Sequence, residues 1–257
     1  MSLLQVQGLC KAFGGVRAVD QVDFALAPGE LLALIGPNGA GKSTLFNMIG
    51  GQLAPSAGSI RLDGREIAGL SPRRIWARGV GRTFQVAATF GTLTVAENVQ
   101  MALLSHQRRV FSFWRGAAAQ HRGQALALLE QVDMREQADR PCSELAYGDV
   151  KRVELAMALS NAPRLLLMDE PTAGMAPAER HALMGLTRRL VDERGMAVLF
   201  TEHSMDVVFA HADRIVVLAR GRLIAQGPPA QVREDARVQE VYFGRGSTFA
   251  AGPGEGA

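Results

Sequence analysis

The sequence is poor in cysteine and has no long hydrophobic run, and both shortages exclude functions. Its two cysteines, Cys10 and Cys142, provide neither a disulfide framework nor the spacing of a metal site, so we interpret them as small buried hydrophobic residues. No apolar run approaches the roughly 18 residues needed to span a bilayer. The N-terminus lacks the basic start and long apolar core of a signal peptide, so we expect the protein to remain in the cytoplasm.

Charge and composition narrow the class of protein without naming a partner. The 257 residues are 47% hydrophobic and 21% charged, which is enough for one large α/β domain or a domain with a subdomain. A net charge of +3 permits contact with anionic lipid headgroups or nucleic acid but requires neither. There is no internal repeat, and the tail 247–257, rich in Gly and Ala, is predicted to be disordered.

The most informative motif follows the apolar run 31–35 and fits the pattern G-x-x-x-x-G-K-[ST] of loops that wrap nucleotide phosphates. Lys42 is expected to reach the β- and γ-phosphates, and the Ser43 hydroxyl to ligate Mg²⁺. Only Lys11 and Lys151 accompany Lys42 among 28 basic residues, so a lysine here indicates that a compact ammonium is needed. The alternative is a glycine-rich turn that matches by accident. The residues predicted to bind nucleotide are Gly36, Pro37, Asn38, Gly39, Ala40, Gly41, Lys42, Ser43 and Thr44.

Hydrophobic patterning predicts an α/β fold with a mostly parallel sheet covered on both faces and antiparallel β structure beside it. The predicted β elements are an edge strand beginning at Leu4, Val6 and Leu9, a half-buried strand at 22–26, hairpins at 59–67 and 215–225, and buried strands at 31–35, 164–168 and 196–201.

From Thr94 to about Ser160 the pattern turns helical and interrupts the alternation of strands and helices. Apolar residues share one face in the stretches 125–132 and 150–158. We therefore predict one nucleotide-binding domain over 1–246. Within it, 1–93 and 161–246 form the α/β core with its β subdomain, and 94–160 form a helical subdomain.

Two adjacent carboxylates follow the strand at 164–168. Ligands of such sheets bind beyond the carboxyl ends of the strands, so Asp169 is predicted to hold Mg²⁺ and Glu170 to polarise the attacking water. The alternative is a capped strand end with solvated acids, but the phosphate loop upstream favours the functional interpretation.

His203 and Gln85 occupy comparable positions. His203 follows the strand 196–201 and is predicted to bond the γ-phosphate, whereas His106, His121, His181 and His211 are interpreted as surface or packing residues. The amide carbonyl of Gln85 can bond Mg²⁺-bound water, which suits a sensor, although a surface glutamine is the alternative.

A second anion site is predicted away from these strands, at the helix that begins after Leu145. Gly148 exposes backbone N–H groups at that helix N-terminus, beside Ala146 and Tyr147. Because this loop belongs to the helical block, its simplest use is on a nucleotide held by a second subunit. An ordinary helix start, with Ser143 or Asp149 near the cap, is the alternative.

These motifs occur in the order found in ABC-type ATPases, and the chain resembles that family from Leu3 to about Gly244. By this resemblance the fold is that of a P-loop NTPase of RecA-like type, and the substrate is ATP with Mg²⁺. The resemblance further implies that Phe13 stacks on adenine and that Ala146, Tyr147 and Gly148 bind the nucleotide of a partner. The motifs are Walker A (36–44), the Q-loop (Gln85), the signature (145–149), Walker B with the catalytic base (Asp169, Glu170) and the switch (His203).

A finer resemblance is to the ATP-binding subunits of branched-chain amino-acid importers. It rests on the segments 13–20, 82–85, 145–148 and 202–205, the insert 105–124 and the ending 241–244. Such subunits act as a pair, self or sister, beneath two membrane permeases that a periplasmic binding protein supplies. The chain would thus lie at the cytoplasmic face of the inner membrane. Importers of urea, short amides or aromatic acids and the lipopolysaccharide-export ATPase are the alternatives.

The chain departs from the family pattern in two loops. Ala146, Tyr147 and Asp149 stand where the usual signature has Ser, Gly and Gln, and the lost hydroxyl removes one γ-phosphate donor. Ala176 stands where the family often has Asp or Asn, which affects communication between the two sites rather than hydrolysis.

We therefore predict an ATP-driven motor in which Lys42, Gln85, Glu170 and His203 carry catalysis and Ser43, Gln85 and Asp169 organise Mg²⁺. The surface 86–109 is predicted to face the permease. The arginines and aromatics at 108–115 indicate either permease or membrane contact or a solvated loop. A soluble ABC ATPase that acts on ribosomes or DNA, or a module that grips ATP without turnover, are the rival functions.

Overall fold

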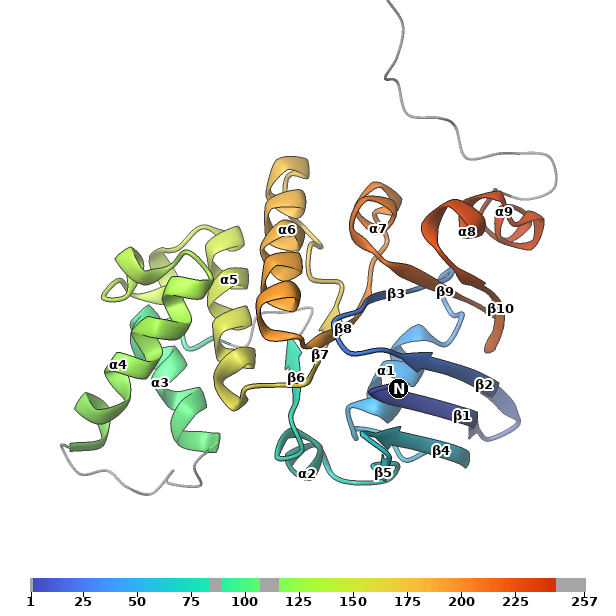
Figure 1. The fold of residues 1–257 in the computed structure, drawn as a ribbon, viewed down its shortest axis with the longest axis horizontal. Helices are drawn as coiled ribbons and strands as arrows, with labels where there is room; N and C mark the ends of the chain where they lie inside the picture. The colour runs from blue at the N-terminus through green and yellow to red at the C-terminus, as the bar shows by residue number, and fades with distance from the viewer. Residues whose placement is uncertain (1, 84–88, 107–115, 244–257) are drawn as a thin grey trace, which may run out of the picture.

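The computed structural model describes residues 2–83, 89–106 and 116–243, which are arranged as a central sheet between two layers (Figure 1). Six strands form this sheet in the order β10-β9-β3-β8-β7-β6. The first five from β6 onward are parallel, and only β10 runs antiparallel, against β9. The strands are β3 (Leu31–Ile35), β6 (Val80–Thr83), β7 (Leu165–Asp169), β8 (Ala197–Thr201), β9 (Arg214–Ala219) and β10 (Arg222–Gly227). The predicted α/β fold with a mostly parallel sheet is confirmed.

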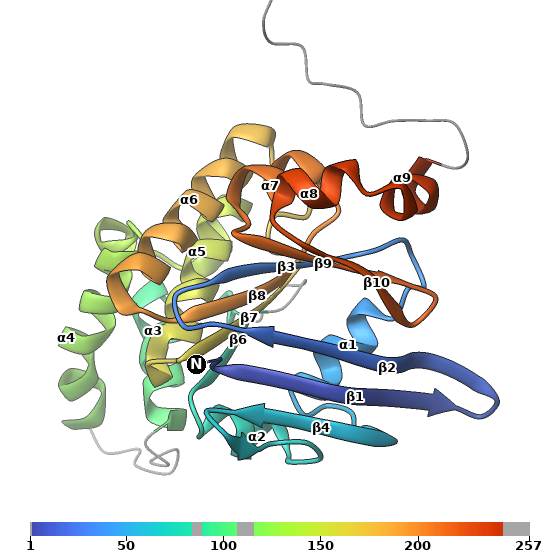
Figure 2. The same cartoon turned by 45° about the vertical axis from the view of Figure 1, so that its right-hand side comes forward.

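A second sheet of four antiparallel strands lies beside the first (Figure 2). Its strands are β1 (Leu4–Phe13), β2 (Val16–Leu26), β4 (Ala57–Leu62) and β5 (Arg65–Glu66), in the order β2-β1-β4-β5. The prediction that the first strand lies at an edge is wrong, because β1 pairs with β2 on one side and with β4 on the other. The pairing with β4 joins segments more than 40 residues apart, which local alternation of residues does not reveal.

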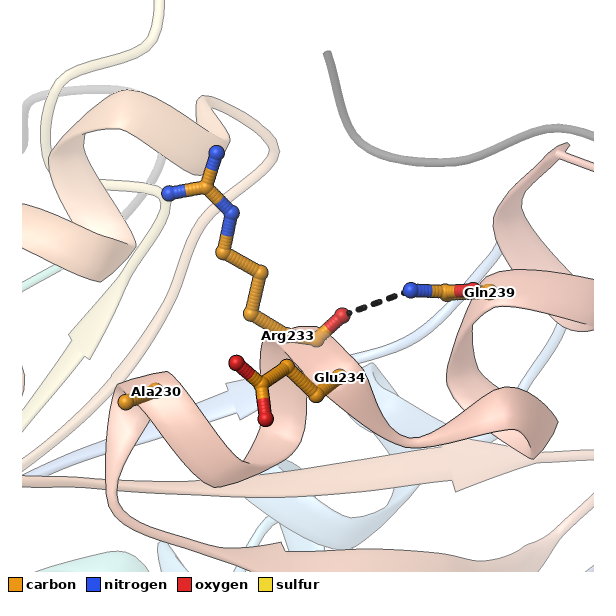
Figure 3. Close-up of a pocket in the computed structure, with 4 residues that line it drawn as sticks. All are labelled: Ala230, Arg233, Glu234 and Gln239. Carbon is orange, nitrogen blue, oxygen red and sulfur yellow. Dashed lines mark hydrogen bonds between the residues drawn. The ribbon is translucent and has the colours of Figure 1, made fainter. Parts of the chain in front are cut away.

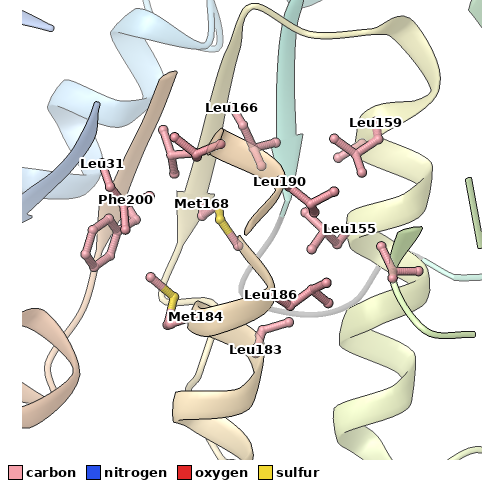
Figure 4. Close-up of a cluster of buried hydrophobic side chains, with 14 of the residues drawn as sticks. Leu31, Leu155, Leu159, Leu166, Met168, Leu183, Met184, Leu186, Leu190 and Phe200 are labelled. Atoms are coloured by element: carbon pink, nitrogen blue, oxygen red, sulfur yellow. The ribbon is translucent and has the colours of Figure 1, made fainter. Parts of the chain in front are cut away.

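Side chains that alternate along the central strands pack into two separate hydrophobic cores, one on each face of the sheet. On one face, residues such as Leu32, Leu34 and Leu167 pack with α1 (Lys42–Ile49) and the four-stranded sheet. On the other face, Leu166, Met168 and Phe200 pack against α6 (Pro177–Arg194) and α7 (Met205–His211). Figure 4 shows this second core, in which side chains of α6 meet those of the sheet and of α5 (Tyr147–Ala158). The inner strands β3 and β8 are thus buried on both sides, as parallel sheets require.

The helical segment stands at one end of the molecule (Figure 1) and contains α3 (Val95–His106), α4 (Gly116–Gln131) and α5. Thr94 and Glu97 begin α3 with reciprocal bonds. The Glu97 amide donates to the Thr94 hydroxyl at 3.2 Å, and the Thr94 amide donates to the Glu97 carboxylate at 2.8 Å. His121 is buried within α4, in keeping with a packing residue. Short 3₁₀ turns lie at Arg135–Gln137, Cys142–Glu144 and Leu159–Asn161.

The remaining helices are short. They are α2 (Pro72–Trp76) next to β5, and α8 (Pro229–Glu234) and α9 (Ala236–Phe243) after β10. Within the described residues, no helix combines the length and the hydrophobicity that crossing a bilayer demands. The predicted disordered tail, 247–257, lies outside the described residues.

Candidate functional site

The phosphate loop connects β3 to α1, and its backbone shape depends on glycine. Gly36 and Gly41 have φ angles of 155° and 104°. A Cβ on Gly36 would lie 2.2 Å from the carbonyl oxygen of Leu218, and one on Gly41 would lie 2.3 Å from that of Ala18. These approaches leave no room for a side chain at either position, so the backbone of the loop requires glycine there. The loop ends at the N-terminus of α1, where the helix dipole favours an anion.

Lys42 is the buried cation of this loop. Its side chain folds back so that Nζ donates to the carbonyl oxygens of Gly36 at 2.6 Å and Pro37 at 3.1 Å. Burial lowers the pKa of Lys42, and the negative charges of Glu170 and Asp169 oppose that shift. The ammonium therefore lies within electrostatic reach of both carboxylates that the sequence assigns to the same site.

The two carboxylates stand at the end of β7, next to the end of β8. Thr201 on β8 fixes both of them, since its hydroxyl donates to Asp169 Oδ1 at 2.9 Å and accepts the Glu170 amide at 3.0 Å. Glu170 has a φ of 48°, a left-handed conformation that is unfavourable for a residue with a side chain. Strain of this kind persists where the surroundings determine the backbone, and here the Glu170 N–H is held by the hydroxyl and the carbonyl oxygen of Thr201.

His203 meets that carboxylate. Its Nε2 lies 2.7 Å from Glu170 Oε1, and the imidazole is half exposed. The sequence assigned His203 to the γ-phosphate, whereas the structure shows it paired with the proposed base. The pair leaves the second imidazole nitrogen available and places a proton donor or acceptor directly on Glu170.

Sequence reasoning missed two residues that organise this edge, Thr201 and Glu202. Glu202 is buried and accepts the Thr172 hydroxyl at 2.6 Å and the Thr172 amide at 2.9 Å, which fastens the loop after Glu170 to the strand before His203. The available signal was position, because Thr201 ends the strand next to the one that carries Asp169 and Glu202 follows it directly.

The donors present suit Mg²⁺. The ion prefers oxygen ligands and is usually held by one or two carboxylates together with substrate phosphates, rather than by a closed protein cage. Ser43 is an exposed residue with a hydroxyl, and the Asp169 side chain is 21% exposed. Within the described part of the chain, no cluster of three or more His, Cys, Asp or Glu residues could hold a metal by itself. Gln85, the third predicted ligand, lies outside the described residues.

Phe13 closes the hairpin between β1 and β2 and is 48% exposed. The ammonium of Lys11 lies 5.2 Å from the centre of its ring, which keeps one cation close to the exposed aromatic face. An exposed ring of this kind is available for stacking.

The signature loop, residues 145–149, begins α5 with Ala146 at the N-cap and Asp149 in the first turn, where the helix dipole favours a negative charge. Tyr147 is 46% exposed, with Lys151 Nζ 5.7 Å from the centre of its ring. A Cβ on Gly148 would meet Met175 at 3.4 Å and Glu179 at 3.5 Å. Among the described residues, no hydrogen bond joins this loop to the phosphate loop, and α5 and α1 lie in different parts of the molecule (Figure 1). The two predicted nucleotide-binding regions are therefore not bonded to each other within one chain.

A pocket lined by residues of α8 and α9 is separate from these residues (Figure 3). It is lined by Ala230, Arg233, Glu234 and Gln239, and the Gln239 amide donates to the Arg233 carbonyl at 3.1 Å. None of the residues predicted for catalysis or nucleotide binding lines it.

Sequence comparisons give the family. The model of the family described as ABC transporter matches residues 19–173, and that described as branched-chain amino acid ATP-binding cassette transporter matches residues 222–247. The high-affinity branched-chain amino acid transport ATP-binding protein BraF of Pseudomonas aeruginosa is 38% identical, over 94% of this chain and 98% of its own length. The corresponding protein LivG of Escherichia coli K12 is 39% identical over the same shares.

Structural comparisons agree. A nucleotide-free ATP-binding cassette from an ABC transporter superimposes with a TM-score of 0.86 at 31% identity, over 95% of this chain and 100% of the other. The ADP conformation of the cassette MJ1267 gives 0.85 at 30%, over 95% and 99%. A dimeric post-hydrolysis state of the cassette MJ0796, bound to ADP and Pi, gives 0.74 at 26%, over 88% and 98%.

Fold and site thus define an ATP-binding cassette. The two relatives described above, both ATP-binding proteins of branched-chain amino acid transport, match along nearly their whole length and narrow this class of protein further. The chain belongs to the ABC transporter ATP-binding proteins, and within them to the branched-chain amino acid type. The family resemblance inferred from the sequence motifs is confirmed.

Proposed function

We propose that this chain is the ATP-hydrolysing subunit of an importer of branched-chain amino acids. The observation that carries the proposal is the convergence of Lys42, Asp169, Glu170 and His203 at the carboxyl edge of the parallel sheet. A phosphate-binding lysine, a magnesium-binding carboxylate and a positioned base are the parts that phosphoryl transfer to water requires.

The residues divide the work as follows. The loop 36–44 binds the phosphates, Phe13 stacks on adenine, and Ser43, Gln85 and Asp169 are the magnesium ligands, directly or through water. When bound, Mg²⁺ neutralises charge on the phosphate oxygens. Glu170 accepts a proton from the attacking water, and His203, held 2.7 Å from Glu170, orients that carboxylate and can share the proton.

The half-site at Ala146, Tyr147 and Gly148 is proposed to act on the nucleotide of a second ATPase subunit, either another copy or a sister chain. Its exposure on the outside of the helical segment and its separation from the phosphate loop support this role. Closure of such a pair around ATP, and reopening after hydrolysis, would provide the conformational change that drives transport.

We propose that two membrane permeases, which receive substrate from a periplasmic binding protein, respond to this conformational change. The chain would then lie at the cytoplasmic face of the inner membrane. Within the predicted contact surface 86–109, Phe90 is 55% and Met101 41% exposed, and apolar side chains left exposed in this way suit a protein contact. The segment 108–115 lies outside the described residues, and its contact with permease or membrane stays a prediction, to be tested by charging Phe113 and Trp114.

The test is the variant Glu170→Gln. It should bind ATP as tightly as the wild type and lose turnover by about 100-fold or more, since general-base catalysis contributes on that scale. Glu193→Gln, the same change on an exposed carboxylate of α6, should leave both unchanged. Turnover by Glu170→Gln near the wild-type rate would overturn the assignment.

A further inference from the structure

Arg82 is a largely buried arginine of the carboxyl edge to which the mechanism above gives no role. It lies near the end of β6, beside Leu167 of β7, and its side chain is only 13% exposed. Three polar contacts join the guanidinium to described residues of α1, the turn after it and β7. Nη1 donates to Gln52 Oε1 at 2.7 Å, and Nη2 donates to Asn47 Oδ1 at 2.9 Å and to Asp169 Oδ2 at 3.4 Å. It therefore joins α1 and its following turn to the carboxylate proposed to hold Mg²⁺.

The space for this guanidinium is built into the end of α1. Gly50 caps that helix, and a Cβ there would lie 2.7 Å from Arg82 Nη1 and 2.5 Å from Gln52 Oε1. The backbone of Gly50 is right-handed, with a φ of −79°, so conformation alone does not call for glycine. The missing side chain instead leaves room for the guanidinium and its amide partner.

Asp169 is consequently held on both carboxylate oxygens. The Thr201 hydroxyl donates to Oδ1 at 2.9 Å from one side, and Arg82 donates to Oδ2 at 3.4 Å from the other. The two donors come from the two strands that flank β7 and fix the torsion of the Asp169 carboxylate. Groups that surround a metal ligand set the direction of the ligand in this way.

The lengths of the contacts indicate which partner anchors Arg82. The two bonds to the neutral amides are short, whereas the contact with Asp169 is longer than the 2.7–2.9 Å typical of a charge-assisted bond. The guanidinium is thus anchored by Asn47 of α1 and Gln52 of the turn after it, and its contact with Asp169 is the weakest of the three.

We propose that Arg82 is a positioning residue that sets the carboxylate of Asp169 for Mg²⁺ and ties it to the helix of the phosphate loop. The inference rests on the proposed role of Asp169. It predicts the direction in which Mg²⁺ binding changes when Arg82 is replaced, because the positive charge of Arg82 and its orienting bond have opposite effects on that binding. If Arg82 only repelled Mg²⁺, its removal would strengthen metal binding, whereas loss of an orienting donor weakens it.

The test measures ATP affinity by calorimetry in excess Mg²⁺ and in EDTA, and compares the ratio of the two affinities between variants. In Arg82→Gln the ratio should fall about tenfold, the scale seen when a residue that orients a metal ligand is lost. The affinity in EDTA should stay unchanged. Arg82→Lys keeps the charge but cannot bridge both amides and the carboxylate, so its ratio should also fall. Arg78→Gln, at an exposed arginine that bonds the Glu66 carbonyl, is the matched control and should have the wild-type ratio.

Gly50→Ala provides a second route that keeps the guanidinium and moves it, and it should lower the ratio in the same direction. An unchanged or increased ratio in Arg82→Gln overturns the inference. If Arg82→Gln does not fold, the ratio in Gly50→Ala decides in the same way. The variant Asp169→Asn separates failure of the proposed magnesium ligand from failure of the proposed role of Arg82. A ratio unchanged in that variant contradicts the proposed magnesium ligand itself, whereas a lowered ratio there beside a wild-type ratio in Arg82→Gln contradicts only the role of Arg82.

Discussion

At the carboxyl edge of the central sheet, Lys42, Asp169 and Glu170 all have partners in their own chain, whereas the signature loop 145–149 presents its residues outward. Lys42 is 7% exposed and bonded to two carbonyls, and Glu170 is paired with His203. Tyr147 is 46% exposed, and the hydrogen bonds of the described residues do not connect its loop to the phosphate loop. One region has its side chains bonded within the chain, and the other is an exposed loop for which we propose a second subunit as the partner.

The largest effect is expected at Lys42. In Lys42→Ala, ATP affinity should fall by about 100-fold, because the charged bonds from a buried ammonium to phosphate are lost. Lys42→Arg should not restore it, since the planar fork cannot occupy the space that places Nζ within 3.1 Å of two loop carbonyls. Titration of each variant with ATP measures the effect, and wild-type affinity in Lys42→Ala would remove this lysine from the site.

Gly148→Ala should affect turnover and spare ATP binding. The added methyl fits within the chain, at 3.4 Å from Met175, but enlarges the surface that would meet the partner's nucleotide. We expect turnover of the assembled pair to fall about tenfold, as a small misplacement at a reacting centre can cause, with the ATP affinity of the isolated chain unchanged.

Gly185→Ala on α6 is the control for Gly148→Ala, because a Cβ at Gly185 meets no atom within 4 Å. If Gly148→Ala weakened ATP binding by the isolated chain, the signature loop would act on the chain's own nucleotide, and the contrast between the two regions would fail.

A smaller effect is expected at Phe13. Loss of the stacking ring in Phe13→Ala should weaken ATP binding about fivefold, in line with the modest free energy of an aromatic stack. Phe90→Ala removes the other strongly exposed phenylalanine among the described residues and should leave ATP affinity unchanged. Equal affinities of the two variants would mean that the ring at 13 does not contact the base.

The smallest effect concerns pH and lies outside both regions. Burial, followed by the charge of His181 at 3.0 Å, lowers the pKa of His211 below its usual value of 6.5. Below that pH the unfolded chain binds a proton that the folded chain does not, so the free energy of unfolding should decrease as the pH falls from about 7.5 to about 5.5. Melting temperatures should decline less over this interval in His211→Gln, and an equal decline in both proteins would refute the linkage.

Local sequence patterns anticipated the parts of the site that are local. The phosphate loop is one contiguous motif, and Asp169, Glu170 and His203 could be placed because parallel strands end at one edge. Contacts between distant segments could not be predicted in this way. Arg82 touches Asp169 across 87 residues, and Thr201 across 32. Neither pairing has a motif, because it depends on which strands become neighbours.

The same limitation explains the error in the four-stranded sheet. Alternation in β1 showed that it is a strand but not that β4 would cover its second side. For the signature loop, the single chain shows an exposed Tyr147 and no bond to the phosphate loop among the described residues, and a contact between two subunits leaves no pattern in one sequence.

The most direct test of the account is uptake of labelled leucine, isoleucine, valine and urea by the native cells, with and without this chain. The account predicts that removal of the chain abolishes uptake of the three amino acids and spares urea, and that the wild-type chain restores uptake whereas Glu170→Gln does not. Undiminished uptake of all three amino acids, or loss of urea uptake alone, would contradict it.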